Sequence, residues 1–385
     1  MMTTRAQAGN SPAAAGMRTP DVPCAGVATR RRASGAALRF FALLAVFLFA
    51  APVPLFPQAA SNINLNATLQ QWSFEREPSR STNPARWKSQ WNRIEVERDK
   101  SFFTLNGSRV WLGAPVSENN GTYLLRRADL DNTLVPLLYP RSTPAAPVAR
   151  VRHVLLDPGH GGKDTGGRNP RLGIDEKTVS FDVARRVKFI LEKQGFQVTL
   201  TRTQDTFVEL SDRVAMAKKI RADLFVCIHF NTAADASSAN GIETYVLTPQ
   251  GQHSTNDAAS HSASAAQVRA REIGHQYGPW NTLLGYQVHT SLTRKLGADD
   301  RGLRRARFHV LRDAACPAVL VECGFLSNAA ESARISTGAH REKIAQGIAD
   351  GILRYRQITD QLTAPAPTAP TPTPTPTAPK APRRR

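Results

Sequence analysis

Cysteine is scarce in this sequence, with four residues in 385. Cys24 precedes an apolar run that we expect to belong to a removable segment, so three cysteines remain, and an odd number argues against a disulfide framework. Cys227 and Cys323 lie in or beside apolar runs, where we expect them to be buried as small hydrophobic side chains. A Cys316–Cys323 bridge is the alternative that the sequence leaves open.

Acidic side chains are outnumbered, since 31 Asp and Glu stand against 50 Lys and Arg, which gives a formal net charge of +19. Such an excess attracts polyanions, and both nucleic acid and the anionic bacterial envelope are polyanions. The sequence has no helix-turn-helix pattern, zinc-finger spacing or RNA-binding aromatic motif, so we expect no nucleic-acid partner. A basic surface that serves solubility alone is the other interpretation.

Long apolar runs are absent except near the N-terminus, where Arg30–Arg32 precede the run Phe40–Ala51 and a small residue follows at Ala59. This layout is typical of a secretory signal, so we expect residues 1–60 to be a targeting segment and the protein to be exported to the periplasm or cell envelope. The run is short for a membrane span, although Ala36–Phe56 is just long enough. Membrane contact is therefore expected only through the signal or an uncleaved anchor.

Composition divides the rest of the chain into regions. Short alternating runs around the turn signal Asn106-Gly107 indicate a small, mainly-β module with a hairpin at residues 91–140. This segment resembles the small N-terminal module of copper amine oxidases, which recurs in bacterial envelope proteins, and a generic spacer fold is the alternative. Residues 141–150 are expected to be a linker, and the Pro- and Thr-rich residues 360–385 a disordered, solvated tail.

The largest region, residues 151–358, alternates strand and helix patterns. Apolar runs predict strands at Val151–Asp157, Gln197–Thr201, Leu224–His229, Ile242–Leu247, Phe308–Leu311 and Ala318–Glu322. Helices are predicted between them where apolar residues recur on one helical face, and Gly195 and Gly297 are expected to end two of these helices. The alternation implies an α/β fold in which a twisted, mostly parallel sheet is flanked by helices on both faces.

One polar segment, residues 249–279, interrupts this alternation and shows no strand pattern. A stretch this long inside a compact domain is usually a lid, a binding loop or disorder. Val268–Ile273 predict a short helix within it. We expect this inserted loop to exert weak regulation or none.

Four ionisable side chains stand at the ends of these predicted elements. His160 lies in a Gly-rich turn after the first strand, Glu176 opens the next helix, and His229 and Glu322 end two buried strands. Parallel strand ends gather at one edge of a sheet, where ligands bind. Two imidazoles and one carboxylate are typical ligands of a catalytic zinc, which leaves the other carboxylate free to act as acid or base. Taken alone, each residue also has a structural explanation, such as helix-dipole compensation for Glu176.

The order of these motifs resembles that of the zinc-dependent N-acetylmuramoyl-L-alanine amidases of bacterial cell walls. The resemblance rests on Asp157–Asp164, Glu176-Lys177, Ile228–Asn231 and Val321–Asn328, with further similarity at Thr201-Arg202, Asp205, Arg213, Asp300–Leu303 and Phe308–Leu311. It implies that His160, Glu176 and His229 bind Zn²⁺ and that Glu322 is the catalytic carboxylate. It also implies hydrolysis of the amide bond between N-acetylmuramic acid and L-alanine in peptidoglycan, for cell-wall remodelling or cell separation.

Three further residues are candidates for substrate binding. Asn231 is expected to hydrogen-bond the sugar or the peptide, and Arg301 and Arg304 are expected to hold the anionic peptide stem. A solvated basic turn is the alternative interpretation of the two arginines.

Regulation is a separate expectation. In some septal amidases a helix in this region covers the zinc until a partner removes it, so Glu272 is a candidate autoinhibitory ligand, with His253, His261 and His275 as rivals. An activator protein of the envelope would then be a partner beside peptidoglycan.

Two other functions stay open. The first is a catalytically silent, peptidoglycan-binding envelope protein, against which the presence of all four chemical residues argues. The second is a zinc peptidase that acts within the stem peptide, against which the absence of a His-Glu-x-x-His motif argues.

Overall fold

The structure is a computed structural model that describes residues 61–78, 83–143, 150–233, 238–255 and 263–364. All of them belong to one structural unit, Phe56–Arg385. The expected targeting segment 1–60, with Cys24, and the residues from 365 onward lie outside the described residues. No helix in the described part of the chain is long and apolar enough to span a bilayer.

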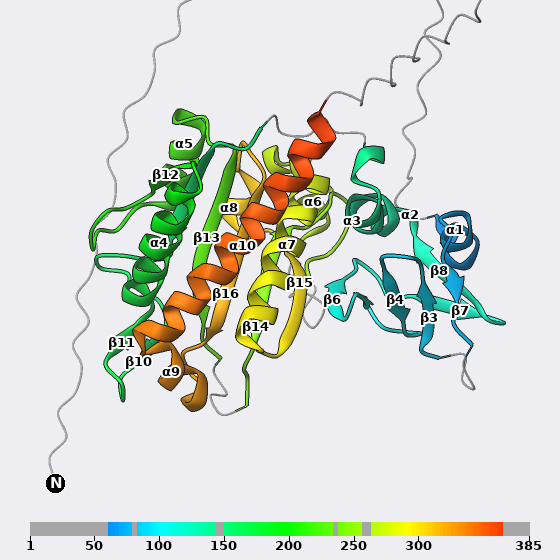
Figure 1. The fold of residues 1–385 in the computed structure, drawn as a ribbon, viewed down its shortest axis with the longest axis horizontal. Coiled ribbons are helices and arrows are strands. Elements are labelled where there is room, and N and C mark those ends of the chain that lie inside the picture. The colour runs from blue at the N-terminus through cyan, green and yellow to red at the C-terminus, as the bar shows by residue number, and fades with distance from the viewer. Residues whose placement is uncertain (1–60, 79–82, 144–149, 234–237, 256–262, 365–385) are drawn as a thin grey trace, which may run out of the picture. The chain divides into compact units, whose positions relative to one another are not determined.

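An eleven-stranded sheet organises the described residues, in the order β12-β9-β13-β16-β14-β15-β6-β5-β4-β3-β2 (Figure 1). Its first six strands are β12 (Gln197–Leu200), β9 (His153–Pro158), β13 (Leu224–Asn231), β16 (Ala318–Phe325), β14 (Ile242–Leu247) and β15 (Asp300–Ala306). Neighbours among these six pair in parallel, except that β14 and β16 are antiparallel. The predicted α/β fold with a mostly parallel sheet is confirmed.

Helices cover both faces of these six strands. One face carries α4 (Glu176–Lys193), α7 (Gly278–Leu296), α9 (Ala329–Ile335) and α10 (Gly338–Thr363), and the other carries α5 (Leu210–Lys219) and α8 (His309–Arg312). Successive residues of β13 alternate between two apolar cores: Val226 packs in the core that contains α4, α7 and α10, and Phe225 in the core that contains α5 and α8. The near-continuous apolar strand therefore reflects burial on both faces.

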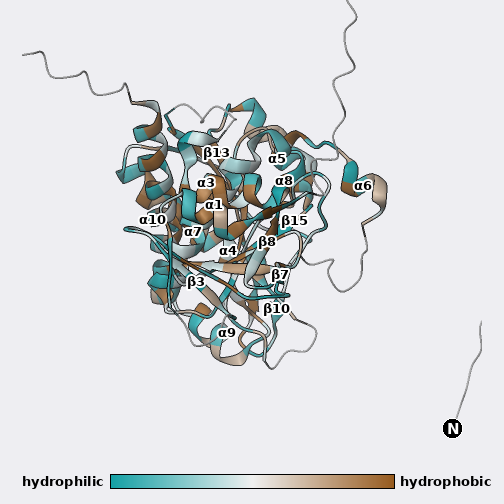
Figure 2. Ribbon diagram, turned by 90° about the vertical axis from the view of Figure 1, so that its right-hand side faces the viewer, coloured by the Kyte–Doolittle hydropathy of each residue, from teal (hydrophilic) through white to brown (hydrophobic). Residues whose placement is uncertain are grey.

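The periodic apolar positions form the buried stripes of the helices. Ile344, Ile348 and Ile352 of α10 are fully buried, and Figure 2 shows the same helix as a mixture of apolar and polar residues. Gly195 and Gly297 follow α4 and α7 with positive φ, which confirms the two predicted helix ends.

The N-terminal module begins earlier than the alternating runs suggest. Its elements are β1 (Asn62–Asn64), α1 (Leu65–Gln71), β2 (Glu75–Arg76), β3 (Ala85–Lys88), β4 (Arg93–Val96), β5 (Phe102–Leu105), β6 (Ser108–Trp111), β7 (Ser117–Asn119), β8 (Thr122–Arg126), α2 (Arg127–Asp129), η2 (Leu130–Leu134), α3 (Val135–Leu138) and η3 (Pro140–Ser142). Trp87, in a stretch of mostly polar composition, is buried edge-on against Tyr123, with ring centroids 5.7 Å apart. The hairpin predicted at Asn106-Gly107 is confirmed between β5 and β6.

The module is joined to the main domain at β6 and β15. Val110 and Leu303 are paired in register, and the Trp111 indole N–H donates to the Arg301 carbonyl at 2.9 Å. Asp300 accepts from the Arg109 backbone N–H at 3.0 Å. The expected linker 141–150 lies mostly outside the described residues.

One predicted strand is wrong. Phe308–Leu311 do not form a strand, because Phe308 caps the short helix α8, and the strand that precedes it is β15. Three arginines concealed β15 in the sequence. Arg305 is nevertheless buried there, since its guanidinium donates to the hydroxyls of Thr282 at 2.9 Å and Thr133 at 2.8 Å.

The inserted segment 249–279 contains two short helices, α6 (Ala265–Arg269) and η5 (Ile273–Tyr277). The helix predicted at Val268–Ile273 is therefore misplaced, because it spans the end of one and the start of the other. Ser264 is the N-cap residue of α6 and forms a capping box with Gln267, which fixes the start of that helix. Residues 256–262, with His261, lie outside the described residues.

Candidate metal centre

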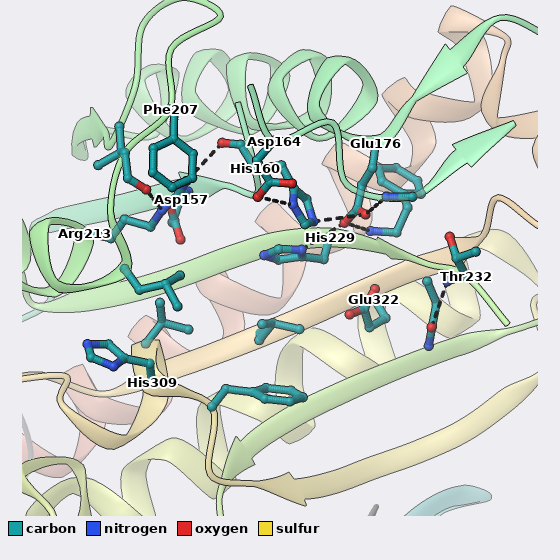
Figure 3. Close-up of a pocket in the computed structure, with 18 of the residues that line it drawn as sticks. Asp157, His160, Asp164, Glu176, Phe207, Arg213, His229, Thr232, His309 and Glu322 are labelled. Carbon is teal, nitrogen blue, oxygen red and sulfur yellow. Dashed lines mark hydrogen bonds and ion pairs between the residues drawn. The ribbon is translucent and has the colours of Figure 1, made fainter. Parts of the chain in front are cut away.

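The edge of the sheet forms a pocket of about 610 Å³ that contains all four predicted chemical side chains. His160 follows β9, Glu176 opens α4, His229 lies near the end of β13, and Glu322 lies on β16. Figure 3 shows the side chains of His160, Glu176 and His229 close together, with Glu322 below them in the view. Apolar side chains also line the pocket, among them Phe207, Val208, Leu210, Phe308, Val310 and Leu320.

Three of these side chains form one compact donor cluster. His160 Nε2 lies 3.0 Å from Glu176 Oε2, and His229 Nδ1 lies 2.9 Å from Glu176 Oε1. One ligand atom from each residue lies within 4.8 Å of the other two. Ligand atoms about 2.1 Å from a tetrahedral zinc are roughly 3.4 Å apart, so the cluster needs little rearrangement to hold an ion.

Glu176 is fixed as an anion at the centre of this cluster. Its Oε1 accepts from the Phe230 backbone N–H at 3.0 Å, and its Oε2 accepts from the Gly167 N–H at 2.7 Å. Burial raises the pKa of Glu176, but hydrogen bonds and charges from His160 and His229 outweigh burial and hold that pKa well below its usual range.

His160 is oriented by Asp164. Its Nδ1 lies 2.8 Å from Asp164 Oδ2, which leaves Nε2 directed at the cluster. A carboxylate on the second nitrogen is the usual support of an imidazole that binds a metal. Burial lowers the pKa of His160, and interactions with Glu176 and Asp164 outweigh burial and raise it.

Two glycines give the ligands their space. A Cβ atom on Gly159 would lie 2.3 Å from His229 Cε1, and one on Gly166 would lie 2.5 Å from His160 Cδ2 and 2.6 Å from Glu176 Oε2. No side chain fits at such distances, so these positions require glycine. Gly159 therefore leaves room for the imidazole of His229, and Gly166 leaves room for His160 and Glu176.

Glu322 is the fourth ionisable side chain of the pocket. It differs from Glu176 because one of its carboxylate oxygens, the buried Oε2, lacks a hydrogen-bond partner among the described residues. Burial raises the pKa of Glu322 well above its usual range, and the charges of Glu176 and Glu243 raise it further. A buried carboxyl oxygen without a partner, next to a cluster of two imidazoles and a carboxylate, fits an ion with a bound water.

Asn231 lines the pocket, but Arg301 and Arg304 do not. Arg301 Nε lies 2.7 Å and Arg304 Nε 3.4 Å from Glu243 Oε1, and Asn231 Nδ2 donates to Glu243 Oε2 at 3.0 Å. The two arginines thus pair with a buried carboxylate outside the pocket, and their role in substrate binding stays a prediction. The sequence patterns did not single out Glu243, although an acid within an apolar strand signals a buried partner.

Glu272 is not brought to the metal cluster. Its carboxylate lies 3.8 Å from Arg312 Nε, its backbone N–H donates to His275 Nδ1, and neither Glu272 nor His275 lines the pocket. His253 does not line it either. Glu272 is the N-cap residue of η5 in this structure, and its autoinhibitory role stays a prediction. His309, which was expected within a strand, does line the pocket.

All three cysteines in the described residues are free and buried. The expected packing of Cys227 and Cys323 is confirmed, and no Cys316–Cys323 bridge forms between these described residues.

The comparisons with known proteins agree on one protein family. The family described as N-acetylmuramoyl-L-alanine amidase matches residues 154–354. The amidase LytC of Bacillus subtilis is 35% identical over 202 residues, which cover 52% of this chain and 35% of LytC. The amidase AmiA of Salmonella typhimurium is 37% identical over 226 residues, which cover 53% of this chain and 76% of AmiA. The catalytic domain of CwlV from Bacillus (Paenibacillus) polymyxa has 35% identity and a TM-score of 0.43, with 54% of this chain and 99% of that domain covered.

Proposed function

Because the chain belongs to the N-acetylmuramoyl-L-alanine amidase family, we propose that it hydrolyses the amide bond between N-acetylmuramic acid and L-alanine in peptidoglycan. The observation that carries this proposal is the cluster of His160, Glu176 and His229 in the same pocket as Glu322, whose buried Oε2 has no hydrogen-bond partner among the described residues. Region 151–358 is the proposed catalytic domain. The match covers about a third of LytC, so the activity of the whole chain is part of the proposal.

We propose Zn²⁺ as the ion, held by His160, Glu176 and His229. Two imidazoles and one carboxylate are a donor set of catalytic zinc sites, and the cluster fits it. When bound, the ion polarises the substrate carbonyl and lowers the pKa of water. Asp164 fixes the imidazole of His160, and the two backbone donors fix the carboxylate of Glu176, so the ligands are held ready for the ion.

Glu322 is the proposed catalytic carboxylate. It accepts a proton from the attacking water, whose oxygen bonds to the carbonyl carbon of the lactyl group. The C–N bond then breaks, and Glu322 returns the proton to the leaving nitrogen. The products are a free lactyl carboxylate and a stem peptide with a free N-terminal amine. Burial raises the pKa of Glu322, and a raised pKa makes its carboxylate a better acceptor for the water proton.

Because peptidoglycan belongs to the cell envelope, we propose that the protein is exported and acts in the periplasm or cell envelope. The signal-like layout of residues 1–60 and the net charge of +19 support export and attraction to an anionic wall. A role in cell separation and an activating envelope protein are further predictions. Asn231, whose amide is held by Glu243 at the pocket wall, is the proposed substrate-binding residue.

Digestion of purified peptidoglycan, followed by mass spectrometry of the released fragments, tests this function. We expect stem peptides with a free N-terminal L-alanine and glycan strands with free lactyl groups, and we expect a chelator to abolish release until Zn²⁺ is restored. Glu322→Gln is the matched control, because it should keep Zn²⁺ but lose about 10²–10⁴-fold in rate. A cut within the stem would support a peptidase instead, and binding without release would support a silent wall-binding protein.

A further inference from the structure

The turn that carries His160 has an unfavourable backbone conformation. His160 has φ of 60°, in the left-handed region that residues with a Cβ rarely adopt. This conformation is less favourable than a right-handed one, so surrounding contacts have to hold it in place. The contacts come from two buried guanidinium groups behind the turn.

Arg213 of α5 donates hydrogen bonds directly to the backbone of this turn. Its Nη2 donates to the His160 carbonyl at 3.0 Å, and its Nη1 donates to the Pro158 carbonyl at 3.1 Å. The same Nη1 lies 2.6 Å from Asp157 Oδ1, and the side chains of this ion pair are 3% and 1% exposed. A buried guanidinium needs such a counter-ion, because an unpaired buried charge is strongly destabilising.

Arg202 links the same turn to the helix that carries Glu176. Its Nη2 donates to the Gly159 carbonyl at 3.0 Å and to the Lys177 carbonyl at 2.7 Å. Lys177 is the residue after Glu176, in the first turn of α4. The turn that holds the first imidazole is therefore tied both to α5 and to the origin of the carboxylate ligand.

We infer that Arg213, with Asp157 as its counter-ion, is a positioning residue that holds His160 in its strained conformation and so sets the affinity of the site for its ion. This inference rests on the proposed function, since it assumes that His160, Glu176 and His229 bind the metal. Arg213 touches no ligand side chain, and it acts through the backbone of His160. Its planar fork reaches several carbonyls at once, which a lysine ammonium on a flexible stem does not do.

The test compares Arg213→Lys with Arg305→Lys. Arg305 is an equally buried arginine that donates to Thr282 and Thr133 and is absent from the pocket, so it controls for the loss of any buried guanidinium. Zn²⁺ affinity is measured by competition with a chromophoric chelator, well below the melting temperature of the metal-free variants. We expect Arg213→Lys to weaken Zn²⁺ binding about 10–100-fold and Arg305→Lys to leave it unchanged while losing stability.

Equal Zn²⁺ affinity in Arg213→Lys and the parent chain would overturn the inference and leave the proposed function standing. The same loss of affinity in Arg305→Lys would also overturn it, because the effect would then follow general stability. A parent chain that binds no Zn²⁺ would overturn both. If Arg213→Lys does not fold, Thr201→Val serves instead, since it removes the 2.6 Å hydrogen bond to Asp157 Oδ1 and keeps the volume, and we expect a smaller loss of affinity in the same direction.

Discussion

Glu243 and Glu322 lie directly opposite each other on the antiparallel strands β14 and β16. Glu243 is paired with Arg301 and Arg304, whereas Oε2 of Glu322 has no partner in the described part of the chain. Burial raises the pKa of Glu322, and the charges of Glu176 and then Glu243 raise it further. Two facing carboxylates in one buried site thus have different electrostatic surroundings.

The first prediction concerns the pH dependence of activity in Glu243→Gln. Removal of this negative charge lowers the pKa of Glu322, and hydrolysis requires Glu322 to be deprotonated before it accepts the water proton. The rising, acidic limb of the kcat/KM profile should therefore shift to lower pH. The control is Glu331→Gln, since Glu331 is also a buried carboxylate but is not among the groups that shift Glu322. A limb that stays in place, or moves to higher pH, contradicts the assignment of Glu322.

The second prediction uses two glycines with nearly the same backbone conformation. Gly166 has φ of +65° and Gly173 has φ of +63°, but a Cβ meets His160 and Glu176 at Gly166 and nothing within 4 Å at Gly173. Alanine should cost about 1 kcal/mol of backbone strain at either position. Only Gly166→Ala should also lose Zn²⁺ affinity, by at least about tenfold, as measured by chelator competition. Equal affinity in the two variants would show that the cluster tolerates displacement of its ligands.

The third prediction concerns stability in acid. Asp182 of α4 accepts from the guanidiniums of Arg186 and Arg341, the second of which lies on α10. Burial raises the pKa of Asp182, but these hydrogen bonds and charges outweigh burial and lower it. A carboxylate whose pKa is lower in the folded than in the unfolded state stabilises the fold above the unfolded value, and this contribution is lost as pH falls through the folded value.

Asp182→Asn should therefore lower the free energy of unfolding by about 1 kcal/mol at neutral pH. The difference from the parent chain should shrink once the pH falls below about 4. Urea unfolding of both proteins at neutral and acidic pH measures this. A difference that is independent of pH would mean that the hydrogen bonds of Asp182 do not depend on its charge.

The fourth prediction follows from the position of Glu272 at the N-terminus of η5. Its carboxylate lies near Arg312 at the start of η5, outside the pocket. Glu272→Ala should thus leave the basal rate of peptidoglycan hydrolysis unchanged within about twofold, because it removes no group from the metal cluster. A marked rise in basal rate, at unchanged stability, would restore the idea of an autoinhibitory ligand.

The four chemical residues were predictable because two simple rules apply to them. Parallel strand ends meet at one edge of the sheet, and His229 and Glu322 stand on apolar strands where an unpartnered polar group is costly. The Gly-rich sequence around His160 indicated a turn after the first strand. Helix positions were predictable as well, since the apolar residues of α4, α7 and α10 repeat with the helical period.

The sequence did not show which charged side chains pair when the partners are far apart along the chain. Strand β15 is rich in arginine, and its partners Glu243, Thr282 and Thr133 come from three other segments, so no local pattern marks Arg305 as buried. The hydrogen bond from Arg213 to the His160 carbonyl likewise joins residues that are 53 positions apart. Periodicity reports how a residue lies on its own element, but it does not report which distant group completes its hydrogen bonds.

His160, Glu176 and His229 come from different parts of the fold and are proposed to bind one ion, whereas Glu322 beside them is proposed not to bind it. Anomalous diffraction at the zinc absorption edge, from crystals of the protein grown with Zn²⁺, tests it most directly. We predict one peak in contact with His160, Glu176 and His229, with Glu322 in the same pocket but not bonded to the ion. A peak at other residues, or none with Zn²⁺ in excess, would contradict the account.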